Sequence, residues 1–261
     1  MIPEQLTAEQ IQVFLLIFVR ITAMITLLPI FGSQNIPVQL KAGFSFLLAI
    51  ILFPMVPVNA PESFVFTIPS FALFVIRELF VGLTIGYATS LLFAAVQFAG
   101  RLVDTQMGFA LVRLVDPFSN AASTVTGQFQ ILIYSIVFLL INGHYFLLLA
   151  VQKSFEVIPL LGANMPTGSV ANVLVSMVAD VFIMAVRLAA PVYSVLVLTS
   201  LSLGIVARTV PQINIFFVGL PLKIGLGLTT FAIVLPVLVL IFRGMFEMLM
   251  NDIWKLLYLM A

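Results

Sequence analysis

The sequence predicts an all-α protein, with about six long hydrophobic helices, that is integral to a membrane or to a membrane complex. Its composition, the length of its apolar runs and the turn residues between those runs all indicate this class. The chain has 261 residues, of which 62% are hydrophobic and 8% are charged. Soluble domains contain roughly 45–50% apolar and about 25% charged residues. Most of this apolar surface must therefore face lipid or other apolar helices.

Six segments are apolar enough to be candidate spanning helices, each of which needs about 20 residues. The second candidate is short, whereas the third, fifth and sixth are long, so six simple crossings describe them poorly. Some of these helices are expected to be bent, tilted or packed on protein rather than lipid. The candidates are residues 11–31, 43–57, 71–99, 129–151, 173–206 and 215–250.

The joints between these segments carry residues that are typical of turns. Pro191 and Pro236 instead lie inside apolar segments, where each is expected to kink a helix. The chain shows no tandem repeat, so the organisation predicted is one helical unit. The joints read PIFGSQNIP (29–37), PMVPVNAPES (54–63), DPFSNAASTVTG (116–127) and PLLGANMPTG (159–168).

Several classes of function are excluded by the residue types present. The formal net charge is +1 and no basic tract occurs, so nucleic acid is not an expected partner. The chain has no cysteine and a single histidine, His144, so it cannot form a metal site rich in these residues. No G-x-S-x-G elbow is present, and Asp180 is the lone carboxylate of its segment. We therefore expect no catalytic, cofactor or metal site.

Charged residues in this sequence mostly have an opposite charge nearby. Examples are Arg77–Glu78, Arg101–Asp104, Lys153–Glu156 and Arg243–Glu247. Those three or four residues apart lie on one helix face and can neutralise each other. Asp180 and Arg187 are seven residues apart and lie on nearly the same helix face. We interpret these two as a buried neutralised pair; the alternative is a proton or substrate relay in a transporter. Arg20 lacks a local partner, so we expect it to meet a carboxylate or carbonyls on another helix or subunit.

One stretch, GIVARTVPQINIFFVGLPLKIGLGL (204–228), places a polar turn between two of the most apolar segments. It closely resembles the C-terminal signature of the FliR family of flagellar biosynthetic proteins, which are subunits of the type III secretion export gate. Two further stretches resemble the same family, so the similarity covers essentially the whole chain. The motif RTVPQIN resembles the flagellar branch of the family rather than the equivalent subunit of a virulence injectisome. The two other stretches are FVRITAMITLLPIFGSQNIPVQLKAGFSFLLAIILFPMVP (18–57) and FLLINGHYFLLLAVQKSFEVIPL (138–160).

The resemblance implies a subunit of a protein-export channel in the bacterial inner membrane, at the flagellar basal body. It implies assembly with FliP-like and FliQ-like subunits, beside FlhA-like and FlhB-like components and in contact with membrane lipid. Unfolded flagellar proteins would pass through this channel. It further implies a FliP-like part, residues 1–172, followed by a FliQ-like helical hairpin, residues 173–261. The alternative of another class is a stand-alone secondary transporter, which the scattered helix breaks and the dissimilar halves disfavour.

The polar turn itself is interpreted as the tip of the FliQ-like hairpin, at the entrance side of the gate. Its prolines are expected to prevent one continuous helix, and its polar side chains can satisfy the backbone groups freed there. Gly219 permits an unusual backbone angle or a close approach by a neighbouring helix. The alternative is an ordinary solvated loop. The residues of this motif are Arg208, Pro211, Gln212, Asn214, Phe216, Gly219, Pro221 and Lys223.

The stretch DTQMGFALVRLVDPFSNAAS (104–123) is too apolar for a plain loop. Bulky, adaptable side chains suit a constriction, and hydrophobic constrictions can block ions. In the family that the chain resembles, the corresponding loop enters the pore as a plug, so residues 106–122 are predicted to close the resting channel. The alternative is packing against neighbouring helices. The apolar residues concerned are Met107, Phe109, Leu111, Val112 and Phe118.

Overall fold

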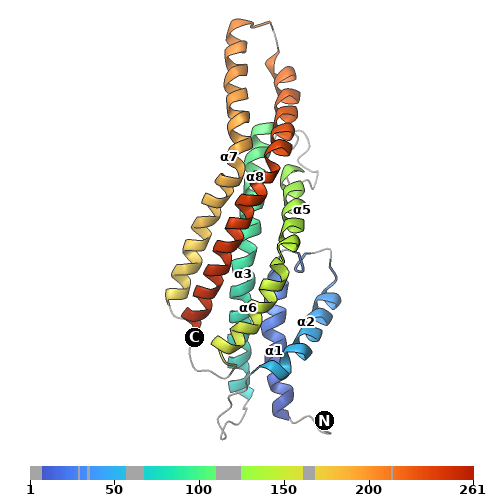
Figure 1. Ribbon diagram of the computed structural model, residues 1–261, viewed down its shortest axis with the longest axis vertical. Helices are drawn as coiled ribbons and strands as arrows, with labels where there is room; N and C mark the ends of the chain where they lie inside the picture. The colour runs from blue at the N-terminus through green and yellow to red at the C-terminus, as the bar shows by residue number, and fades with distance from the viewer. Residues whose placement is uncertain are drawn as a thin grey trace. The chain divides into compact units, whose positions relative to one another are not determined.

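The computed structural model confirms an all-α chain (Figure 1). It describes residues 8–28, 30–33, 36–56, 68–109, 125–160, 168–212 and 214–261, and these contain helices and no strand. Five of the helices in this part of the chain are long and apolar enough to cross a membrane, and one bent pair makes a sixth candidate. The elements are α1 (Ala8–Leu27), α2 (Val38–Leu52), η1 (Phe53–Met55), α3 (Ile68–Met107), α5 (Val125–Leu140), α6 (Gly143–Val157), α7 (Gly168–Thr209) and α8 (Ile215–Met260).

The predicted segment 129–151 differs from the structure, because two helices occupy it. Helices α5 and α6 meet at 65°, and the break lies at Asn142, whose φ is 57°. Asparagine is one of the few residues other than glycine that adopts this left-handed conformation without a large cost. The Asn142-Gly143 dipeptide is a turn signal, but the apolar residues on both sides of it made the segment look continuous.

Proline interrupts this chain less than the sequence suggests. Pro191 lies inside α7, and Pro221 and Pro236 lie inside α8. The prediction that Pro221 prevents a continuous helix is therefore wrong. Proline removes one backbone donor, and an apolar helix tolerates this loss when the rest of its ladder is intact. The break instead lies at Pro211, and α8 begins where the Asn214 carbonyl accepts hydrogen bonds from the next turn.

The chain divides into two compact units, each made of separate stretches of sequence. Unit 1 comprises Met1–Leu91, Asn142–Met177 and Met248–Ala261, and unit 2 comprises Leu92–Ile141 and Val178–Glu247. Helices α3, α7 and α8 each contribute residues to both units. The units therefore do not follow the order of the chain, because long helices carry one stretch of sequence from one unit into the other.

In unit 1, helices α1 and α3 approach each other closely at two glycines of α3. A side chain at Gly82 would collide with the backbone oxygen of Arg20, and one at Gly86 would lie 2.8 Å from the backbone oxygen of Met24. Small residues allow this kind of backbone approach between apolar helices. On another side of α1, Phe14 packs edge-on against Phe46, with ring centroids 5.3 Å apart.

Unit 2 is organised around a cluster of aromatic side chains. Phe93 of α3 packs edge-on against Phe138 of α5 and Phe242 of α8, with centroid distances of 5.7 and 6.2 Å. Tyr134 of α5 also contacts Phe242, at 4.7 Å. The cluster buries side chains from three helices, which positions the end of α3 beside α5 and α8.

Candidate functional site

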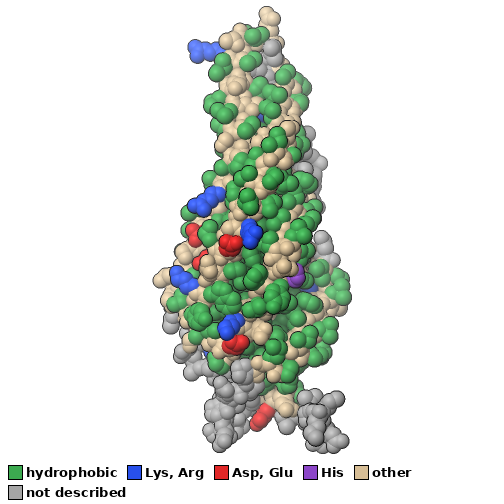
Figure 2. Space-filling model, in the orientation of Figure 1, with side chains coloured by type: hydrophobic (Ala, Val, Ile, Leu, Met, Phe, Trp, Pro, Cys, Tyr) green, Lys and Arg blue, Asp and Glu red, His purple; other side chains and the backbone are tan. Residues whose placement is uncertain are grey.

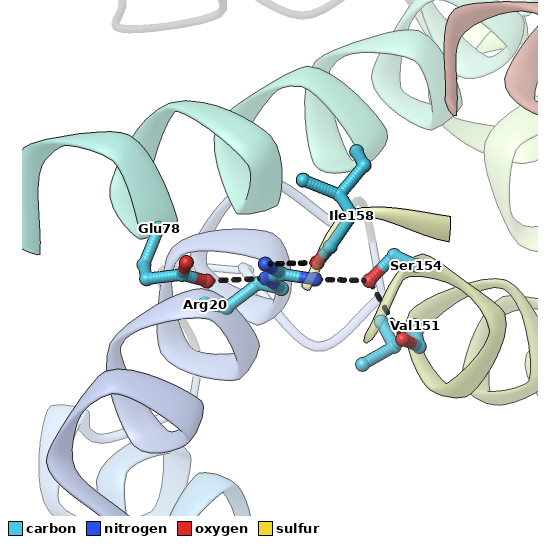
Figure 3. A network of polar contacts seen from close by, with 5 residues as sticks. All are labelled: Arg20, Glu78, Val151, Ser154 and Ile158. Atoms are coloured by element: carbon cyan, nitrogen blue, oxygen red, sulfur yellow. Dashed lines mark hydrogen bonds and ion pairs between the residues drawn. The ribbon is translucent and has the colours of Figure 1, made fainter. Parts of the chain in front are cut away.

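A network of buried polar groups joins α1, α3 and α6 in unit 1 (Figure 3). The Arg20 Nε donates to Glu78 Oε2 at 2.5 Å. Its Nη1 donates to the Ser154 hydroxyl at 3.0 Å, and its Nη2 donates to the carbonyl oxygen of Ile158 at 3.1 Å. The Phe155 ring lies against the guanidinium, with its centroid 4.2 Å from Cζ. The expectation that Arg20 meets a carboxylate or a carbonyl on another helix is confirmed.

The other sequence-based charge pairs have mixed outcomes. Lys153–Glu156 and Arg243–Glu247 form ion pairs, with N–O distances of 2.5 and 3.5 Å. Glu78 pairs with Arg20, on another helix, and forms no ion pair with its neighbour Arg77 within the described residues. Adjacent residues point in different directions around a helix, so closeness in sequence did not decide this pairing.

Asp180 and Arg187 are not brought together. Arg187 is exposed and Asp180 is half-buried, and neither belongs to an ion pair among the residues that the structure describes. The predicted buried pair is therefore not formed within this chain. Two helical turns separate the two Cα atoms by about 10 Å along the axis, so a contact would require both side chains to extend toward each other along the helix.

The end of α3, in unit 2, has a defined geometry. The Gly108 backbone adopts a φ of 93°, and the N–H groups of Gly108 and Phe109 both donate to the carbonyl oxygen of Asp104 at 3.1 Å. A left-handed glycine just after the last helical residue is a common way for a helix to end, because it satisfies the free carbonyls of the last turn. The chain therefore leaves α3 at a fixed point.

The side chain of Asp104 joins this helix end to the start of α5. Its Oδ1 accepts a hydrogen bond from the backbone N–H of Thr126 at 3.2 Å, and the residue is only 2% exposed. A carboxylate at a helix N-terminus satisfies a free N–H and interacts favourably with the helix dipole. Asp104 was expected to pair with Arg101, but Arg101 is exposed. The cap holds the residues flanking 110–124 close together.

Met107, the last residue of α3, is fully buried beside the same cap. The Thr126 hydroxyl lies 3.8 Å from its sulfur, and the end of its side chain contacts Gly227 of α8. One residue earlier, Gln106 Nε2 donates to the Tyr193 hydroxyl of α7 at 3.0 Å. The last turn of α3 therefore contacts three helices: α5 through Thr126, α7 through Tyr193 and α8 through Gly227.

The predicted plug residues fall on both sides of the limit of the described chain. Met107 packs against neighbouring helices, which was the alternative interpretation at this position, and Phe109 is half-buried just after α3. Leu111, Val112 and Phe118 lie outside the described residues. The capping role of Asp104 and the contact at Gly227 are not apparent from the sequence, because the signal for each is only a single residue.

The predicted hairpin-tip motif lies at the junction of α7 and α8. Arg208 occupies the last turn of α7, and its side chain is exposed, as are those of Pro211, Gln212 and Asn214. Gly219 is buried within α8 and its φ is not positive, so the unusual backbone angle is not observed. The remaining members are Pro221, which is exposed, Lys223, which is half-buried, and Phe216, whose side chain lies outside the described part of the chain.

Acidic and histidine side chains do not gather into a metal site in the described residues, where no three of them come together. The buried polar groups instead join helices. The interactions available at these sites are hydrogen bonds, ion pairs and close packing. They can hold the helices that they join in fixed positions.

Comparison with known proteins gives matches along nearly the whole chain. The family model described as bacterial export proteins, family 1, matches residues 11–249. The chain is 36% identical over 250 residues to the flagellar biosynthetic protein FliR of Bacillus subtilis (strain 168), covering 95% of each chain. It is 27% identical over 253 residues to FliR of Escherichia coli (strain K12), covering 95% of each. It is also 31% identical over 221 residues to the surface presentation of antigens protein SpaR of Shigella sonnei, covering 82% of this chain and 83% of that relative.

Proposed function

Because the chain belongs to family 1 of the bacterial export proteins, we propose that it is a structural and gating subunit of the flagellar type III export gate. Its membership makes it a component of a flagellar or related type III export apparatus. The finer proposal is that it forms, with FliP-like and FliQ-like subunits, the channel through which unfolded flagellar proteins pass. This channel lies in the bacterial inner membrane at the flagellar basal body, beside FlhA-like and FlhB-like components.

The observation that supports a subunit best is the length of exposed apolar surface on α7. Exposed apolar side chains extend from Val175 to Val206, which is roughly 45 Å along the helix at about 1.5 Å per residue. The hydrocarbon core of a bilayer is only about 30 Å thick. Fitting this surface into lipid would need a tilt of about 50°, whereas helices tilt by roughly 0–40°. Part of the surface must therefore be covered by protein.

Helix α8 adds a second exposed apolar surface, which is shorter and would fit into a bilayer at a tilt of about 30°. Its exposed apolar residues run from Phe217, 74% exposed, to Leu240, 68% exposed, over about 35 Å. On the face shown in Figure 2, hydrophobic side chains cover this part of the α7–α8 hairpin, and a basic group lies at its tip. Apolar neighbouring helices from FliP-like and FliQ-like subunits have the chemistry that would cover it.

Within this assembly, residues 1–172 are assigned as the FliP-like part and residues 173–261 as the FliQ-like hairpin. The short connection between α7 and α8 supports a hairpin. Its tip carries the exposed polar side chains of Arg208, Gln212 and Asn214, and it lies at the entrance side of the gate. An equivalent subunit of a virulence injectisome is the second candidate, favoured by the similarity to SpaR.

The plug assignment for residues 106–122 also belongs to this proposal. The Asp104 cap on Thr126 brings the two flanking helix ends together, so the intervening segment begins and ends at one place. A plug needs this arrangement, because a segment with fixed ends can fill a pore without loosening the helices that carry it. Its bulky apolar residues would exclude water from a constriction.

The subunit proposal is tested by expressing the chain with and without FliP-like and FliQ-like partners and measuring native mass. We expect the chain to be degraded or aggregated alone and to enter one defined complex when the partners are present, because its apolar faces need cover. A transporter of one chain should be stable alone in detergent. A monodisperse, stable monomer that does not join the partners would contradict the proposal.

The plug is tested by replacing residues 110–122 with a short Gly-Ser linker, which suffices because the flanking ends are close. We expect greater ion leak and salt sensitivity in cells that contain the assembled gate. In the control variant, Ser119 and Asn120 are replaced by Gly-Ser at unchanged length, so that the apolar residues remain. Unchanged permeability in the linker variant would refute the plug.

A further inference from the structure

The end of the Met107 side chain occupies the space that a side chain at residue 227 would need. A Cβ atom added at Gly227 would collide with the Met107 Cε and would lie 3.2 Å from its sulfur. The Met107 side chain is fully buried there. The contact joins the last residue of α3 to a position in the interior of α8.

The neighbouring glycine on α8 shows that this space is specific. A Cβ atom added at Gly225 would have nothing within 4 Å, and the same holds for Gly204 of α7. Glycine disfavours a helix interior relative to alanine, so it is expected to remain where a packing partner requires it. Gly227 has such a partner and Gly225 has none among the described residues, which makes the two positions a matched pair.

The contact lies beside the residues that determine how the chain leaves α3. Gly108, with its φ of 93°, follows Met107 directly. Asp104, one turn earlier, caps α5 through Thr126, and Thr126 also lies against the Met107 sulfur. A shift of Met107 would therefore move the cap and the helix end together, because packed side chains transmit displacement.

We propose that Met107 and Gly227 are positioning residues of the closed channel. Their contact fixes the end of α3 against α8, and through the Asp104 cap it fixes the start of α5. The position of the C-terminal hairpin is thereby coupled to the channel's resting closure. This inference rests on the proposed channel function and goes beyond it, because it names the contact through which α8 controls closure.

The test uses the assembled gate and four variants: Gly227→Ala, Met107→Ala, the double variant, and Gly225→Ala as the control. Overpacking at Gly227 should raise ion leak per assembled complex by roughly fivefold or more, because an added methyl in a tight core displaces its neighbours. Met107→Ala removes the contact without overpacking, so it should also raise leak. The double variant places a methyl where the Met107 side chain was, and its leak should lie closer to wild type than that of either single variant. Gly225→Ala should leave leak unchanged.

Complex yield is measured beside leak, so that a structural effect is separated from a positioning effect. Wild-type leak per complex in both single variants would overturn the proposal, even if Gly227→Ala lowers the yield. A double variant that leaks as much as the sum of the single variants would also overturn it, since independent effects add. If Gly227→Ala does not assemble, Met107→Ala alone decides.

Failure of this inference is distinguishable from failure of the proposed function. If the variant with the 110–122 linker leaks and the Met107 and Gly227 variants do not, the channel stands and the coupling is wrong. If none of these variants leaks although all assemble, the proposed plug fails, whereas the subunit proposal is decided separately by the native-mass experiment.

Discussion

At the scale of single residues, Arg20 determines how unit 1 is held together. Burying an ion costs several kcal/mol even after relaxation, and the cost is offset only when good partners satisfy it. All three nitrogens of the guanidinium donate hydrogen bonds, and the Glu78 carboxylate balances its charge. The hydrogen bonds to Ser154 and Ile158 also fix the end of α6, so one side chain sets the positions of three helices.

Removing one partner of this ion pair should be strongly destabilising. Glu78→Gln leaves the Arg20 charge buried without compensation, which costs about 3–5 kcal/mol in comparable cases. Glu156→Gln, at the exposed Lys153 pair, is the control and should change stability little, because exposed ion pairs contribute little. The double variant Arg20→Met with Glu78→Leu removes both charges and should be less damaging than Glu78→Gln. Denaturant unfolding of the purified complex measures all three, and equal stability of the two glutamine variants would show that the buried pair contributes little.

At the scale of elements, the exposed stripe of α8 changes character along its length. Apart from Thr229, the exposed side chains from Phe217 to Leu240 are apolar, as at Ile233. Beyond this point a polar stripe at four-residue spacing is exposed beside the apolar side chains of Met248, Tyr258 and Leu259; its members are Arg243, Glu247, Asn251 and Lys255. The opposite side of the same turns, including Phe246 and Ile253, is buried in protein. An exposed polar stripe of this length is expensive in hydrocarbon, so it is expected to face water.

This change along α8 predicts a pattern of chemical labelling. The chain has no cysteine, so each introduced thiol is the sole target of a membrane-impermeant maleimide. In the assembled gate, Asn251→Cys and Lys255→Cys should label rapidly, whereas Ile233→Cys and Leu240→Cys should be protected by lipid or protein. Equal labelling at Leu240→Cys and Lys255→Cys would show that the change in composition does not mark a water boundary.

At the scale of the whole molecule, the exposed apolar surface along α7 is longer than a bilayer can cover. This surface is therefore expected to be buried against other subunits of an assembly. Each of the two compact units is made of separate stretches of sequence. The proposed boundary between residues 172 and 173 therefore marks the parts that resemble FliP and FliQ, and it does not coincide with a boundary between the compact units. The native-mass experiment addresses this scale, because only an assembly conceals the remaining surface.

Much of this architecture follows from local properties of the sequence. Apolar composition identified the class of protein, and runs of apolar residues located the helices, although α3 and α8 extend 8 and 10 residues beyond the predicted ends at 99 and 250. The break at Asn142 was missed, because a single residue in a left-handed conformation is a weaker signal than the apolar runs around it. The continuity of α8 through Pro221 was also missed, because the cost of a proline depends on whether packing holds the rest of the helix.

By itself, the sequence determined that the chain is helical, apolar and similar to export proteins, because hydropathy and motifs depend only on residues that are close together in the sequence. Tertiary structure alone decided which groups meet. Arg20 pairs with Glu78, 58 residues away, and with Ser154, 134 residues away, and Met107 lies against Gly227 on another helix. Such contacts depend on the packing of whole helices, which favours a particular partner through shape and burial and not through distance along the chain.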